Sequence, residues 1–129
     1  MKKIRLSRKS QARNRLDRNL LSSLFLYEKI RTTSAKSRLL KNHGQSLISR
    51  VSSSSDSLGL RRFLEANLYG GAVARVLDTK GQYTGIRTIK MGYRYGDGAE
   101  QSFVALIKKE GDEIKKLKKG QKKVVDDEV

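Results

Sequence analysis

The chain has 129 residues, with 29 Lys and Arg against 13 Asp and Glu, and its formal net charge is +16. It contains no Cys and one His, which excludes disulfide frameworks, thiolate zinc sites, Cys nucleophiles and sites built from several His. A charge of this size opposes compaction unless a polyanion neutralises it. Composition therefore favours nucleic acid as the partner, with an anionic membrane surface as the second candidate.

Neither a membrane span nor a secretory signal is expected from the sequence. The longest stretch dominated by apolar residues, 20–27, is interrupted by two serines and is far too short to cross a bilayer. The basic residues at the N-terminus are followed by further basic residues and not by an apolar region. We therefore expect a soluble, intracellular protein.

The positive charge is concentrated near the N-terminus. Residues 1–18 hold eight basic side chains, five of them Arg, against Asp17 alone, whereas residues 108–129 hold eight Lys against six acidic residues. A guanidinium can bind phosphate through two hydrogen bonds, while a Lys ammonium acts as a point charge. We therefore predict that residues 1–15 form a basic nucleic-acid-binding arm and that residues 109–129 form a flexible charged tail.

Helical periodicity begins after the arm. Residues 1–14 show no sustained apolar spacing and are expected to be extended. Apolar residues then recur every three or four positions, which predicts an amphipathic helix over residues 16–29. The β-branched residues at 30–33 favour a short strand.

A second helix is predicted to follow this strand, with Thr33 or Ser34 as its N-cap and apolar positions reaching Val51. His43 falls within those apolar positions, so we expect a packed, hydrogen-bonded histidine and not a metal ligand. Further helical turns are predicted after the serine-rich connector at 52–57, with an interruption at Gly70 and Gly71.

The apolar spacing changes to period two from Ile86, which predicts a β-strand. The sequence at 96–98, Gly-Asp-Gly, is a tight-turn signal, and residues 101–107 are apolar enough for a central strand. Tyr93 and Tyr95 are expected to pack against a helix more readily than to stack on bases. The predicted fold is an α/β (α+β) two-layer domain over residues 16–108, in the order helix, short strand, helices and β-hairpin.

The sequence does not support an enzyme. Hydroxyl side chains are plentiful, but a nucleophile needs a positioned base, and the only His lies among the apolar positions of a helix. Asp97 and Glu100 are close in sequence, yet Asp97 lies in a turn, where Asp is selected for its backbone conformation. We expect no catalysis, no cofactor, no metal and no small-molecule substrate.

Two stretches carry a family resemblance. The first combines Arg5-Leu6-Ser7-Arg8, Arg18-Asn19-Leu20, Glu28-Lys29-Ile30 and Thr32-Thr33 with Ala35-Lys36. The second runs from Arg87 to Asp97 as Arg-Thr-Ile-Lys-Met-Gly-Tyr-Arg-Tyr-Gly-Asp. Together they resemble the bacterial family of large-subunit ribosomal protein seventeen, the bL17 type, with its basic arm, its first helix and its closing hairpin in the same order.

The resemblance implies binding to large-subunit (23S-type) ribosomal RNA near the peptide exit tunnel, contact with neighbouring large-subunit ribosomal proteins, and a structural role on the cytoplasmic ribosome. It also implies that the short strand joins the hairpin in one sheet. The resemblance assigns RNA contact to Arg5, Arg8, Arg13, Arg18, Lys36, Arg87, Lys90 and Arg94. Charge and position alone add Lys9 and Arg15.

Two alternatives remain at this point. A nucleoid or RNA-chaperone protein that binds nucleic acid without sequence preference would have a similar charge. A basic protein of the membrane surface is disfavoured, because the arm lacks the aromatic or Leu-rich face that an interfacial helix needs.

Overall fold

The computed structural model describes residues 4–109 and contains helices and strands in the expected order. The helices are α1 (Ser10–Tyr27), α2 (Ser34–Ser53), α3 (Ser57–Asn67) and α4 (Gly70–Asp78). The strands are β1 (Lys29–Thr33), β2 (Tyr83–Tyr93) and β3 (Glu100–Lys108). The charged tail predicted at 109–129 lies, apart from its first residue, outside the described residues.

One antiparallel sheet holds all three strands in the order β1-β3-β2. The register places Lys29 opposite Ala105 and Thr33 opposite Gln101, while Arg87 of β2 pairs with the same Ala105. The short first strand therefore joins the hairpin, and β3 is the central strand, as expected.

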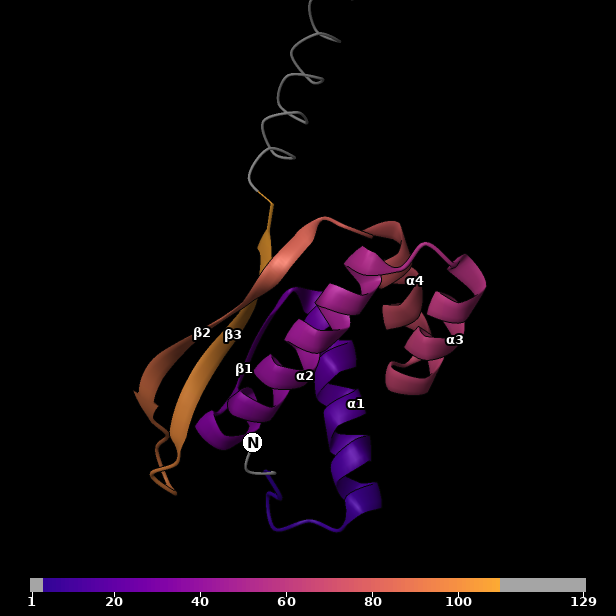
Figure 1. Cartoon of the computed structure of the whole chain (residues 1–129). Helices are drawn as coiled ribbons and strands as arrows, with labels where there is room; N and C mark the ends of the chain where they lie inside the picture. The colour runs from indigo at the N-terminus through magenta and orange to yellow at the C-terminus, as the bar shows by residue number, and fades with distance from the viewer. Residues whose placement is uncertain (1–3, 110–129) are drawn as a thin grey trace, which may run out of the picture.

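The helices cover one face of this sheet, which makes the two-layer α+β arrangement expected from the sequence (Figure 1). Helix α2 packs on β2 and β3, while α1 packs on α4. The apolar positions that gave the helical spacing form one core between the layers. Its largest fully buried members are Leu24, Phe25, Leu40, Leu64, Leu68 and Val104.

Helix α1 differs from the sequence prediction at both ends. It begins at Ser10 instead of residue 16 and ends at Tyr27 instead of 29, so the second half of the predicted arm is helical. The first turns carry almost only polar, exposed residues, and they continue a helix whose buried positions lie further along the chain. The chain leaves the helix at Glu28, which has a left-handed φ of 61°.

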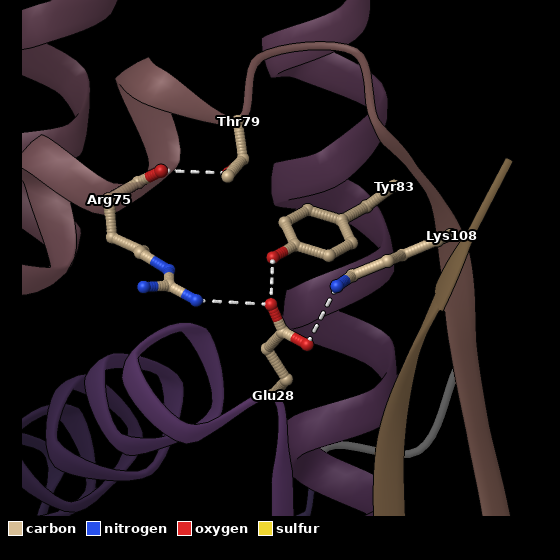
Figure 2. A network of polar contacts seen from close by, with 5 residues as sticks. All are labelled: Glu28, Arg75, Thr79, Tyr83 and Lys108. Atoms are coloured by element: carbon tan, nitrogen blue, oxygen red, sulfur yellow. Dashed lines mark hydrogen bonds and ion pairs between the residues drawn. The ribbon is translucent and has the colours of Figure 1, made fainter. Parts of the chain in front are cut away.

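Glu28 joins the two layers through the network of polar contacts in Figure 2. The network lies where Tyr83 pairs with Lys108, at the end of the sheet away from the hairpin turn. Its Oε1 accepts hydrogen bonds from Arg75 Nη2 of α4 and Tyr83 Oη of β2, each at 3.1 Å, and its Oε2 lies 3.0 Å from Lys108 Nζ of β3. These donors lower the pKa of the Glu28 carboxyl, with Lys108 as the largest cause. One carboxylate therefore connects α1, α4 and two strands.

His43 is hydrogen-bonded, as expected, but it is half-exposed and not part of the core. Its Nδ1 pairs with Asp17 Oδ2 of α1. Burial raises the pKa of Asp17 above its usual value, while His43 acts in the opposite direction. The pair lies in a groove of about 610 Å³ lined by residues of α1, α2 and α3.

Candidate nucleic-acid interface

The arm enters α1 through a turn made by two non-glycine residues in the left-handed region. Leu6 and Ser7 each have φ of 51°, and Arg8 N donates to Arg5 O at 3.1 Å across the turn. A left-handed conformation costs about 1–2 kcal/mol for a residue with a Cβ. The turn places Arg5 and Arg8 on the surface, and Arg13 Nη1 donates to Arg8 O at 3.4 Å.

The start of α1 is electropositive. Lys9 is the N-cap, no acidic residue lies in the first turn, and no side chain caps the unpaired backbone N–H groups. Those N–H groups form the positive end of the helix dipole, which attracts anions. Arg5, Arg8, Lys9 and Arg15 are exposed around this end, and within residues 4–109 their side chains make no ion pair or hydrogen bond. Arg5, Arg8 and Lys9 thus lie together at the turn that leads into α1, and Arg15 lies further along the helix, at the groove between α1, α2 and α3.

Arg18 is the main departure from the predicted site, because its guanidinium is used inside the domain. Its Nη2 donates to Glu65 O at 2.7 Å and to Leu68 O at 2.9 Å, and its Nε donates to Leu68 O at 3.1 Å. The same group stacks 4.3 Å from the centroid of the Tyr69 ring. Arg18 thus binds the carbonyls at the end of α3, so its replacement is expected to disturb the fold.

The cations of the hairpin are also engaged. Lys90 Nζ lies 2.8 Å from Glu100 Oε1. Arg94 Nε donates to Asp97 Oδ1 at 2.9 Å, and a second contact joins Arg94 Nη2 to Asp97 Oδ2. This bidentate pair holds the pKa of Asp97 well below its usual range. The charges of Lys90 and Arg94, to which the resemblance assigns RNA contact, are therefore neutralised within the hairpin itself.

Arg87 lies on the open face of the sheet, which is the face that the helices do not cover. It belongs to a row of residues across the three strands that the sequence did not predict. Lys29 and Arg87 both pair with Ala105, so the three residues cross the sheet side by side on one face. Arg31 lies in the next row, opposite Phe103, and its Nε donates to Gln101 Oε1 at 2.6 Å. Side chains alternate along β1, so Lys29 and Arg31 share one face. Arg87 joins the row of Lys29 only because both residues pair with the same residue of β3.

Lys36 lies in the first turn of α2, at the end of the domain where the arm, the start of α1 and the hairpin turn also lie (Figure 1). Its side chain is partly buried, and no contact of its ammonium group occurs in the described part of the chain. The arrangement combines exposed cations with the uncapped N–H groups of a helix start, and both kinds of group attract anions.

Comparison with known proteins decides the family. The family model for ribosomal protein L17 matches residues 16–107, which is most of the domain described above. The chain belongs to the ribosomal protein L17 family. The match begins within α1 and includes the strands and the remaining helices, so the family resemblance is confirmed, while the residues before 16 lie outside the matched range.

Curated relatives support the same assignment. The chain is 39% identical over 114 residues to the large ribosomal subunit protein bL17 of Borrelia turicatae, covering 81% of this chain and 89% of that protein. It is 32% identical over 111 residues to bL17 of Porphyromonas gingivalis, covering 79% of this chain and 67% of that protein.

The L17 family consists of structural proteins of the large ribosomal subunit, and this chain is one of them. Membership also confirms the expectation that the protein is not an enzyme, since the family is a structural one. Between residues 4 and 109, no helix is long and apolar enough to cross a membrane.

Proposed function

We propose that this L17-family protein binds large-subunit ribosomal RNA through its arm and the start of α1, and thereby stabilises RNA near the peptide exit tunnel. The observation that carries the proposal is the group of four exposed, unpaired cations at one end of the domain, Arg5, Arg8, Lys9 and Arg15. Arg13 lies beside them at the same helix end. Phosphate oxygens match both the guanidinium groups and the amides of the helix end.

A second contact area is proposed on the open face of the sheet. Lys29 and Arg87 lie in one row across the three strands, and their charges are not matched by a carboxylate in the described structure. Lys36 is not part of this face, because it lies at the start of α2 on the covered side of the sheet, where it adds a cation at the end of the domain that holds the arm. These cations would read the shape and backbone of a folded RNA and carry little base identity.

We assign a different role to three of the predicted contact residues, Arg18, Lys90 and Arg94. Each has its donors on a carbonyl or carboxylate of the domain, and an RNA phosphate would have to compete for them. Their first effect is therefore on the fold of α3 and of the hairpin turn. We expect their contribution to RNA affinity to be smaller than that of the arm.

The relatives are named as proteins of the large ribosomal subunit in bacteria, which supports a position on the ribosome for this chain. In this proposal the protein works there, in the cytoplasm, as a binder of RNA and of neighbouring large-subunit proteins. Its role is to hold RNA segments in place during and after assembly.

The test is the salt dependence of binding to large-subunit ribosomal RNA, measured by fluorescence anisotropy with the full chain. The variant Arg5→Ala/Arg8→Ala/Arg15→Ala is expected to bind at least tenfold more weakly. The slope of log affinity against log salt should become shallower by about 0.9 for each phosphate that the variant no longer neutralises. The matched control Lys41→Ala/Arg61→Ala/Arg62→Ala removes three exposed cations from α2 and α3 and should bind as the wild type does.

Equal reductions of affinity in the two variants would overturn the assignment of the arm. Equal affinity of the wild type for ribosomal RNA and for an unrelated RNA of the same length would instead indicate a binder without sequence or shape preference. The arm variant should unfold at the wild-type temperature, because none of its three side chains packs in the core.

A further inference from the structure

The end of the hairpin, residues 89–100, stands apart from the rest of the domain. Strand β1 pairs with β3 only as far as Gln101, so the hairpin end has two strands and no third. Helix α2 begins beside this limit, where the hydroxyls of Ser34 and Ser102 are 2.9 Å apart. The hairpin end therefore projects past the start of α2, the helix that packs on these strands, as Figure 1 shows.

This hairpin end carries exposed apolar side chains. Ile89 and Met91 are about half exposed, Tyr93 is 80% exposed, and Tyr95 is fully exposed. The expectation that Tyr93 and Tyr95 pack against a helix is therefore wrong, because the hairpin reaches beyond the helices. The register shift between Lys90 and Gly92 places Ile89, opposite Phe103, and Tyr93, opposite Glu100, on different faces of the hairpin, so its exposed apolar and aromatic side chains occupy both faces. An exposed projection of this kind indicates a binding surface.

The charges of the hairpin end cancel. Its two cations, Lys90 and Arg94, are paired with its two anions, Glu100 and Asp97, while the whole chain carries +16. A surface that binds RNA phosphates needs unmatched cations, and the two carboxylates here would repel phosphate. The hairpin end is thus chemically different from the arm, although both lie at the same end of the domain.

The surface is formed before any partner arrives. Arg94 N donates to Ala99 O at 2.8 Å, Gly98 N donates to Arg94 O at 3.0 Å, and Ala99 N donates to Asp97 Oδ1 at 3.2 Å. A turn fixed by its own hydrogen bonds loses little conformational entropy on binding.

We infer that the hairpin end, residues 89–100, is a docking surface for a neighbouring protein of the large subunit, and not a further RNA contact beside the arm and the open face of the sheet. The charge pattern identifies the occupant. A protein that binds the same RNA is itself basic, and it would be repelled by most of this chain. The cancelled charges of the hairpin end allow a basic protein to approach, and the exposed Tyr93 and Tyr95 side chains can then be enclosed by that protein.

This inference rests on the proposed placement in the large subunit, and the test separates the two. Because the chain has no Cys, single-Cys variants can each carry one benzophenone maleimide. Tyr95→Cys probes the hairpin end, Ser7→Cys probes the arm, and Leu58→Cys is the control on exposed α3. Each labelled chain is assembled into large subunits and irradiated, and adducts are sorted by their sensitivity to protease or ribonuclease.

The inference predicts that Tyr95→Cys gives a protein adduct with one subunit protein, at several times the yield of Leu58→Cys. A ribonuclease-sensitive adduct at Tyr95→Cys, an adduct with a second copy or within the same chain, or no adduct above the control would each overturn it. An RNA adduct at Ser7→Cys reports separately on the proposed RNA binding. Its absence would count against that function and not against the hairpin surface.

A second variant removes the aromatic rings themselves. Tyr93→Ser/Tyr95→Ser should keep the thermal midpoint of the wild type, since both side chains are exposed. The affinity of this double variant for isolated ribosomal RNA should stay within twofold of the wild type. For crosslinking, Met91→Cys carries the label, either alone or together with the two Tyr substitutions. The yield of protein adduct should be at least fivefold lower when the two Tyr substitutions are present. A reduction of RNA affinity greater than fivefold would show base stacking on the Tyr rings and would contradict the inference.

Discussion

Gly44 of α2 lies directly against Ile86 of β2, so close that a Cβ at position 44 would come 2.3 Å from Ile86 Cδ1. The absence of a side chain at Gly44 sets how closely the central helix approaches the sheet. Glycine inside a helix costs up to about 1 kcal/mol relative to alanine. The contact with Ile86 accounts for a glycine that has no explanation in the sequence alone.

Gly44→Ala is therefore expected to destabilise the protein by about 1–3 kcal/mol, because the strain in the buried contact exceeds the gain in helix propensity. The free energy of unfolding in urea measures this. Gly71→Ala is the matched control, since a Cβ there would lie at an ordinary 3.7 Å from Leu26 Cδ2. The control should be neutral or slightly stabilising, and an equal destabilisation in both variants would contradict the account.

Arg18→Ala is expected to lower the free energy of unfolding by about 1–3 kcal/mol, because the carbonyls of Glu65 and Leu68 lose a charged donor. Arg15→Ala, on the same helix, should leave stability unchanged and weaken RNA binding. Denaturant unfolding and RNA binding of the two single variants check both statements. A loss of stability in Arg15→Ala together with a loss of RNA binding but not of stability in Arg18→Ala would contradict the roles given to the two arginines.

Glu28→Gln is expected to cost about 1 kcal/mol near neutral pH, because the carboxylate loses its charge toward Arg75 and Lys108. The pKa of Glu28 is lowered by folding, so its stabilising effect is present above the ordinary value of 4.5 and is lost as pH falls through the folded value. The difference in stability between the wild type and the variant should thus be constant from pH 6 to 8 and shrink below about pH 4.5. A difference that stays constant down to pH 3 would contradict the assignment.

Asp56→Ala is expected to destabilise the protein by about 1 kcal/mol. The Asp56 side chain caps α3 by accepting from Leu58 N at 3.1 Å and from Gly59 N at 3.0 Å. Asp56→Ser keeps a capping oxygen and should recover most of the stability. Thermal unfolding of the two variants decides this, and equal destabilisation would show that the cap contributes nothing.

The elements of the fold were predictable where burial sets the residue spacing. Each of three helices has a fully buried leucine, namely Leu24, Leu40 and Leu64. Each leucine belongs to a series of apolar residues spaced three or four positions apart. This spacing predicted the helices near their observed positions. The first turns of α1 have no such signal, because their side chains are almost all exposed and do not enter the core. The same reason explains why their cations were assigned to an extended arm.

The candidate site was predictable only in part, because charge reports where cations are and not what they contact. The pair of Arg94 and Asp97 is three residues apart and could have been inferred from the turn sequence. Arg18 meets Leu68 across fifty residues, and this contact exists only in the folded chain. The placement of Lys29 beside Arg87 likewise depends on the strand register.

The most direct test of the whole account is the occupancy of large subunits by the wild type and by Arg5→Ala/Arg8→Ala/Arg15→Ala. Lysates of cells that express each form are separated on a density gradient, and the large-subunit peak is washed with high salt. The account predicts about one copy of the wild type in each washed subunit and a strong depletion of the variant. Wild-type protein that spreads over DNA and free-RNA fractions, or a variant retained like the wild type, would contradict it.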